Sequence, residues 1–177
     1  KDQKETPFRN SKGETKQILS DLEGVSYKEN PFDIFMILAR YKFASRFIKK
    51  KHKVLDAGCG TGMGSQFLSK YSNFVTAGDY DKNIINQNKS EYKNIKFKFL
   101  DLLNIDNSLK NKFDVVVSMD VIEHFELDKI KRVTDNYAKL LSNKGFAIIG
   151  TPNIASRLYA SERRKTIHPH EFSAEEF

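Results

Sequence analysis

Apolar residues follow two different patterns along the chain: a helical spacing in one stretch and short continuous runs further along. Between residues 32 and 48, apolar residues recur every three to four positions, which is the period of a helix that buries one face. Pro31 stands just before this stretch, where the first turn of a helix favours proline. Further along, short runs rich in β-branched and aromatic residues predict strands. These runs are 54–57, 74–77, 95–100, 113–118 and 145–150, and the helical segments predicted between them are 64–71, 82–92 and 127–141.

The order of these elements predicts an α/β fold. Strands that alternate with helices build a parallel sheet covered on both faces. Residues 113–118 read Phe-Asp-Val-Val-Val-Ser, and such a nearly continuous apolar run is typical of a central strand. We therefore expect a doubly wound, Rossmann-like, mostly parallel sheet with helices on both faces, formed by residues 29–177. Residues 1–28 are polar. We expect them to form a leader or a flap, with a short helix at 16–22.

Composition narrows the class of protein. The 177 residues are 39% hydrophobic and 12% aromatic, which suits one globular domain with its own core. Cys59 is the only cysteine, so an intramolecular disulfide and a thiolate-rich zinc site are excluded, and a reducing compartment such as the cytoplasm is favoured. No apolar run is long enough for a membrane span, and the first residues do not resemble a signal peptide.

The net charge of +7 raises the question of nucleic acid binding. The basic residues fall into separate groups at 49–53, 129–132 and 163–165, and acidic residues are interspersed between the groups. This distribution favours a generally solvated basic surface over a nucleic acid footprint.

A glycine-rich turn follows the first predicted strand. Residues 54–62 read Val-Leu-Asp-Ala-Gly-Cys-Gly-Thr-Gly, and glycines at such a turn allow a ligand to approach the backbone closely. A dinucleotide fingerprint places its third glycine one position later, where Met63 stands. A P-loop is excluded because no Gly-Lys-Ser/Thr sequence follows. A tight turn without any ligand is the alternative interpretation.

Two carboxylates end the next two predicted strands. Asp79 follows the glycine-rich turn by about 20 residues, where an acid can accept hydrogen bonds from both hydroxyls of a ribose. It could also cap the following helix, although Asp81 is the better candidate for that cap. Asp101 ends the third strand and could accept a hydrogen bond from an adenine amine, or it could be a turn residue.

These motifs together resemble the class I S-adenosylmethionine-dependent methyltransferases, over residues 41–177. The sequence at 54–62 is similar to the family's first motif, and 113–124 is similar to its fourth-strand motif. The resemblance implies S-adenosyl-L-methionine as cofactor, with Asp56 and Gly58 at its amino acid end and the residues after the fourth strand along its border. The cofactor-binding residues that the resemblance implies are Asp56, Gly58, Cys59, Gly60, Asp79, Tyr80, Asp101, Leu102, Met119, Asp120 and Val121.

The family resemblance also carries expectations about completeness and substrate. A complete sheet of this family has further strands, so we expect residues 29–177 to be a C-terminally incomplete methyltransferase domain. Segments at 39–44, 62–65, 151–153, 168–172 and 174–177 look like those of bacterial methyltransferases found beside glycosyltransferases. This narrower resemblance implies a hydroxyl or amine of a small molecule or glycan precursor as acceptor. The oligomeric state stays open.

His124 and Glu123 are the catalytic candidates. The loop after the fourth strand faces the methyl group in this family, and a histidine has a pKa suited to accepting a proton near neutral pH. The alternative is that His124 packs at a helix start and hydrogen-bonds Glu123. His168 and His170 are expected either on the acceptor side or simply in a loop.

Three other interpretations use the same residues. Asp120, Glu123, His124 and His170 resemble the metal ligands of small-RNA 3′-terminal 2′-O-methyltransferases, but the main interpretation assigns no metal. A non-catalytic scaffold is disfavoured by the intact set of glycines and acids. A nicotinamide dehydrogenase is disfavoured by the glycine spacing and by the absence of an obvious hydride-transfer partner after the fourth strand.

Overall fold

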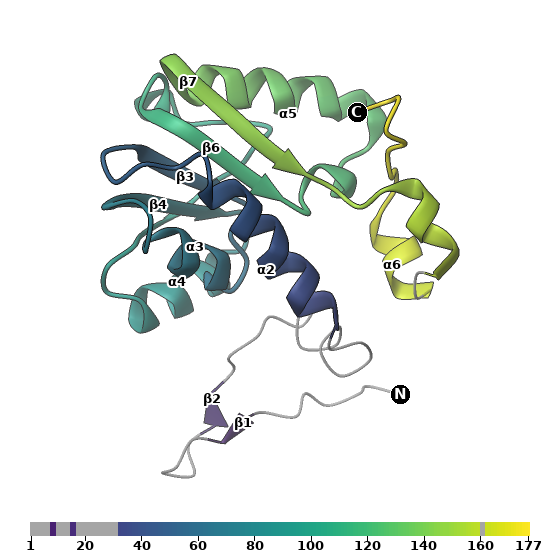
Figure 1. Cartoon of the computed structure of the whole chain (residues 1–177), viewed down its shortest axis with the longest axis horizontal. Helices are drawn as coiled ribbons and strands as arrows, with labels where there is room; N and C mark the ends of the chain where they lie inside the picture. The colour runs from purple at the N-terminus through teal and green to yellow at the C-terminus, as the bar shows by residue number, and fades with distance from the viewer. Residues whose placement is uncertain (1–7, 10–14, 17–31, 160–161) are drawn as a thin grey trace.

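The computed structural model describes residues 8–9, 15–16, 32–159 and 162–177. Five parallel strands form one sheet in the order β5-β4-β3-β6-β7, which confirms the predicted Rossmann-like sheet (Figure 1). The first of these strands, β3, lies in the middle, and the direction of winding reverses between β3 and β6. The strands are β3 (Lys53–Ala57), β4 (Phe74–Asp79), β5 (Lys96–Phe99), β6 (Phe113–Met119) and β7 (Leu141–Gly150).

Helices cover both faces of the sheet, as predicted. Since successive side chains of a strand point to opposite faces, Val115 and Val117 belong to one core and Val116 belongs to the other. The first core receives side chains from α2, α3 and α4, and the second receives them from α5. These helices are α2 (Phe32–Ser45), α3 (Met63–Leu68), α4 (Lys82–Glu91) and α5 (Leu127–Leu140).

The boundaries differ from the sequence prediction mainly at β7. The prediction begins this strand at residue 145, whereas β7 already begins at Leu141. Leu141 pairs with Phe113, and the next pair joins Phe146 to Val115, so the extra residues form an irregularity in the ladder. A Cβ atom on Gly145 would lie 2.9 Å from the Phe113 carbonyl oxygen, and the glycine therefore permits this close approach of the two strands.

The C-terminal segment returns to the sheet. After β7 the chain forms two short helices, η3 (Ile154–Tyr159) and α6 (Glu162–Ile167), toward which the arrowheads of β6 and β7 point (Figure 1). The Ile154 N–H then donates to the Phe172 carbonyl oxygen at 2.9 Å, next to a parallel bridge between Asn153 and Phe172. This return places the residues after α6 beside the carboxyl ends of β6 and β7.

At the N-terminal end, β1 (Phe8–Arg9) pairs with β2 (Thr15–Lys16) in antiparallel fashion. Most of the predicted leader or flap, and the predicted helix at 16–22 beyond residue 16, lie outside the described residues. Among the helices that the structure describes, none combines the length and the apolar character that a membrane span needs.

Candidate cofactor and acceptor site

The predicted site residues gather where the parallel strands end. In the turn after β3, Gly58 and Cys59 donate their N–H groups to the Gly78 carbonyl oxygen of β4, at 2.8 and 3.0 Å. Gly58, Gly60 and Gly62 all have positive φ, at 83°, 48° and 79°. Residues other than glycine rarely adopt this backbone conformation. The glycine-rich turn is therefore held by its own backbone against the neighbouring strand, and the Cys59 side chain is buried behind it.

The Asp56 side chain supports this turn from the protein interior. It is fully buried, and its two oxygens accept hydrogen bonds from the Tyr41 hydroxyl at 3.1 Å and the Ser65 hydroxyl at 2.5 Å. Burial raises the pKa of Asp56 to about 6, although both hydrogen bonds act in the opposite direction. Asp56 thus ties α2 and α3 to the end of β3.

Asp79 joins the glycine-rich turn to the end of β4. Its Oδ2 accepts from the Gly60 N–H at 2.9 Å, and its Oδ1 accepts from the Asp81 N–H at 3.0 Å. The Gly60 carbonyl oxygen in turn accepts from the side-chain amide of Asn88 at 2.8 Å. The Asp81 carboxylate accepts from two N–H groups at the start of α4, which confirms Asp81 as the helix cap and leaves Asp79 at the edge of the sheet.

Aromatic surface lies exposed beside Asp79. The Tyr80 side chain is 71% exposed and Phe99 is 44% exposed, and their ring centroids are 5.5 Å apart. Beyond β5, the Asp101 carboxylate accepts from the Leu103 N–H at 2.8 Å and the Asn104 amide at 3.0 Å, as a turn residue does. The Leu102 side chain is buried in the core on the α5 face.

The residues after β6 pack against the glycine-rich turn. Met119 is buried, and Asp120 follows it with a φ of 56°. The Asp120 N–H donates to the Gly150 carbonyl oxygen at 2.8 Å, and its carboxylate forms an ion pair with Arg40 of α2 at 3.0 Å. Val121 packs on Gly58 so closely that a Cβ atom there would lie 2.3 Å from a Val121 methyl carbon. The loops after β3 and β6 are therefore in direct contact.

Glu123 and His124 lie on the short helix η2 (Ile122–His124). Glu123 is fully buried, and its Oε2 accepts from the Thr151 hydroxyl at 3.0 Å. Its Oε1 has no hydrogen-bond partner among the described residues. Burial, followed by the nearby charge of Asp120, raises the pKa of Glu123 to about 7. His124 is exposed, and its Nδ1 lies 2.9 Å from the Ile167 carbonyl oxygen.

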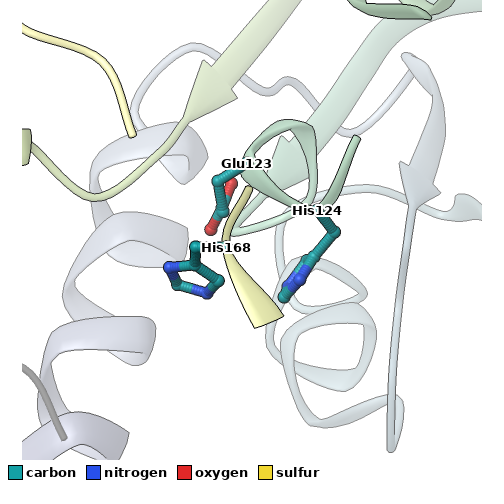
Figure 2. Close-up of side chains that lie close together, drawn as sticks. All are labelled: Glu123, His124 and His168. Carbon is teal, nitrogen blue, oxygen red and sulfur yellow. The ribbon is translucent and has the colours of Figure 1, made fainter. Parts of the chain in front are cut away.

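Of the two later histidines, His168 joins this group. His168 is buried, and its Nδ1 lies 2.7 Å from Oε1 of the buried Glu171. One ligand atom from each of Glu123, His124 and His168 lies within 4.8 Å of the others, and the three side chains converge in Figure 2. His170 instead packs edge-to-face with Phe172 and faces Glu176. The metal set suggested by resemblance therefore contains a different histidine from the group that the structure brings together.

Sequence reasoning did not identify the partners that hold these side chains. Thr151 and Glu171 are absent from the predicted site, as are Tyr41 and Ser65 beneath the glycine-rich turn. The sequence could have suggested the contact of Glu171, because Glu171 stands only three residues after His168 and a histidine and a carboxylate at such short spacing can hydrogen-bond. The contacts of Thr151, Tyr41 and Ser65 join residues 9 to 28 positions apart, so no local sequence pattern predicts them.

A lysine-lined pocket lies at the opposite edge of the sheet. Lys53, Lys96 and Lys112 line it at the amino ends of β3, β5 and β6. None of the predicted site residues lines this pocket. Because open parallel sheets bind ligands beyond the carboxyl ends of their strands, the candidate site is the edge formed by the loops after β3, β4 and β6.

Comparison with known proteins shows the family to which the chain belongs. The family described as "Methyltransferase domain" matches residues 54–145. A protein of Mycobacterium tuberculosis named as a probable S-adenosylmethionine-dependent methyltransferase is 32% identical over 130 residues, which are 70% of this chain and 44% of that protein. A ubiquinone biosynthesis O-methyltransferase of Coxiella burnetii is 29% identical over 116 residues, 63% of this chain and 48% of its own. The chain thus spans about half the length of these relatives.

Solved structures share the fold. The YcgJ protein from Bacillus subtilis superposes with a TM-score of 0.67 at 17% identity, over 78% of this chain and 64% of that one. The PH0226 protein from Pyrococcus horikoshii gives a TM-score of 0.62 at 24% identity, over 81% and 64% of the two chains. Since the methyltransferase-domain family covers more than half of the sequence and the sheet has the expected strand order, the chain belongs to the class I S-adenosylmethionine-dependent methyltransferases.

Proposed function

We propose that this chain transfers a methyl group from S-adenosylmethionine to a hydroxyl, or to an amine, of a small molecule or glycan precursor. The observation that carries the proposal is the placement of the glycine-rich turn, Asp79 and the loop after β6 along one edge of the sheet, at the point where the winding reverses. Ligands of doubly wound sheets bind at this point.

The residues at this edge fit the cofactor. The positive φ angles of the three glycines expose backbone without side chains, so a ligand can lie against the turn. Each Asp79 oxygen accepts one backbone N–H and retains a further lone pair for a ribose hydroxyl. The exposed rings of Tyr80 and Phe99 offer an apolar surface next to Asp79, which suits the flat face of an adenine.

The bound cofactor supplies a methyl group that is already activated by a positively charged sulfur. The chain therefore has to orient an acceptor in line with that methyl group and exclude water. In the transfer, an acceptor oxygen bonds to the methyl carbon while the carbon–sulfur bond breaks and its electron pair passes to sulfur. The hydroxyl proton needs a base, and His124 is our candidate. Its Nδ1 donates to the Ile167 carbonyl oxygen, so Nε2 carries the lone pair of the neutral ring.

The relatives support a hydroxyl as the acceptor group, since the Coxiella burnetii protein is named as an O-methyltransferase. A small or glycan-like acceptor is favoured over nucleic acid by the dispersed basic residues of the sequence. The single cysteine makes the cytoplasm the compartment that we propose.

Calorimetric titration with S-adenosylhomocysteine tests the cofactor site. We expect the chain to bind this product with a dissociation constant on the order of micromolar. Asp79→Asn removes the charge and one acceptor of the ribose contact, so affinity should fall by about 10-fold or more. Asp81→Ala is the matched control, because it removes a carboxylate two residues away that caps α4, and it should leave affinity unchanged.

Two results would count against the cofactor assignment. If the folded chain binds no S-adenosylhomocysteine, the proposal fails. If Asp79→Asn and Asp81→Ala weaken binding equally, Asp79 acts through the turn and not on the ribose.

A further inference from the structure

The group formed by Glu123, His124 and His168 has the composition of a metal site. One carboxylate and two imidazoles bring their ligand atoms within 4.8 Å of one another. They come from two separate segments, η2 and the residues after α6, that meet beside the ends of β6 and β7 (Figure 2). Ligand atoms about 2.1 Å from one ion lie about 3 to 4 Å apart, so small movements of side chains would close the set.

Both histidines are oriented as metal ligands usually are. A carbonyl oxygen can only accept, so His124 Nδ1 donates to Ile167 and the lone pair of the neutral ring is on Nε2. His168 Nδ1 likewise faces the Glu171 carboxylate at 2.7 Å. Metal-binding histidines almost always direct their other nitrogen to a carbonyl or carboxylate, which fixes the tautomer and the ring orientation. Glu171 is only 1% exposed, so this outer contact is rigidly placed.

The carboxylate of the group points independently to a ligand. Glu123 has a relative exposure of 0%, and its Oε1 lacks any hydrogen-bond partner among the described residues. A buried carboxylate oxygen without a partner destabilises the folded state, and the contact with Thr151 satisfies only Oε2. Buried carboxylates are normally paired or coordinate a metal. Glu171 is also buried and contacts the Nδ1 atom of His168, so a second acid lies next to the group.

We propose that Glu123, His124 and His168 bind one divalent transition-metal cation, of which Zn²⁺ is the probe used below. Two imidazoles and one carboxylate suit first-row transition metals, whereas Mg²⁺ prefers oxygen ligands alone. Three protein ligands leave at least one position open, which is typical of catalytic and not of structural metal sites. His124 is exposed, so solvent reaches one side of the group.

The role of the cation rests on the proposed function. An acceptor hydroxyl that occupies the open position would lose its proton more readily, because a bound cation lowers the pKa of its oxygen ligand. The lone pair of His124 Nε2 would then hold the cation instead of accepting a proton. The two roles of His124 therefore exclude each other, and the loss or retention of methyl transfer after chelation distinguishes them.

Calorimetry with Zn²⁺ alone tests the site without any substrate. The chain, free of a histidine tag and treated with a chelator, should bind one equivalent of Zn²⁺. His168→Gln and Glu123→Gln should each weaken that binding by about 100-fold or more, and Glu171→Gln should weaken it by about 10- to 100-fold through loss of the outer contact. His170→Gln is the matched control, since His170 contacts Phe172 and Glu176, and it should bind Zn²⁺ like the unaltered chain.

A second titration distinguishes a loss of Zn²⁺ binding from a loss of folding or of cofactor binding. Each variant is also titrated with S-adenosylhomocysteine, and retained affinity shows that the fold and the proposed cofactor site are intact. Absence of Zn²⁺ binding by the unaltered chain would overturn the metal site and leave the methyltransferase proposal standing. The same conclusion follows if His168→Gln and His170→Gln weaken Zn²⁺ binding equally. The buried His168–Glu171 pair would then be a structural contact alone.

Discussion

Main chain shapes the edge of the sheet beyond β3 and β4, whereas side chains shape it beyond β6 and β7. On the first side, three glycines with positive φ form the surface, and Asp79 accepts two backbone N–H groups. On the second side, Glu123, His124 and His168 converge from distant segments. The glycine-rich turn is one local stretch of sequence that Asp79 joins from 19 residues away, whereas the second region joins η2 to His168 of the C-terminal segment.

The two regions should therefore respond differently to substitution. A backbone-built turn tolerates no added atoms, because its conformation and its packing both depend on the absence of side chains. A group of side chains tolerates changes of shape better, but it loses function when one polar partner is removed. The predictions below test this contrast on stability, which all of the variants report in common.

The largest effect is expected from Gly58→Ala. The residue would have to adopt a φ of 83° and would place its Cβ 2.3 Å from Val121, so strain and overpacking together should lower the free energy of unfolding by about 3 kcal/mol or more. Urea denaturation measures this loss. Adding Val121→Ala should recover part of it by removing the clash. If the double variant recovers nothing, the contact between the two loops is not the cause.

A smaller effect, visible in its pH dependence, is expected from Asp56→Asn. The pKa of Asp56 is raised to about 6 by burial among Tyr41, Ser65 and the core. As pH rises from about 4 to 6, the unfolded chain releases a proton that the folded chain keeps, so this carboxyl group destabilises the folded state increasingly. Relative to the unaltered chain, the variant should therefore gain about 3 kcal/mol between about pH 4 and pH 7.

Urea denaturation across this pH range measures the difference between the two chains. Parallel curves would mean that the Asp56 carboxyl is not perturbed. A difference in the opposite direction would mean that the hydrogen bonds from Tyr41 and Ser65 outweigh burial.

The smallest effect is expected from Thr151→Val. This change removes the hydroxyl that donates to the buried Glu123 carboxylate at 3.0 Å, which should cost about 1–2 kcal/mol of stability. Thr134→Val is the control, because its hydroxyl donates to two carbonyls of its own helix, and we expect a change within about 0.5 kcal/mol. Equal losses in the two variants in thermal denaturation would show that Glu123 does not depend on Thr151.

The strand–helix order was readable because it depends on local pattern. The valines of 113–118 predicted a central strand, and β6 lies between β3 and β7. The cap at Asp81 was also predicted correctly. The predicted start of the last strand at residue 145 was too late, because pairing with β6 extends β7 back to Leu141. That pairing is a contact between distant segments, so the local sequence pattern does not predict it.

The sequence by itself determined the sheet, the glycine-rich turn and the acids that follow the strands. The patterns that predicted these features each lie within a few positions of sequence, where periodicity and backbone preference act. Only the tertiary structure decided that His168, and not His170, lies with Glu123 and His124, that Glu171 orients it, and that Asp56 is buried between Tyr41 and Ser65. The reason is physical, since burial and hydrogen bonding between distant segments depend on how the chain returns to the sheet.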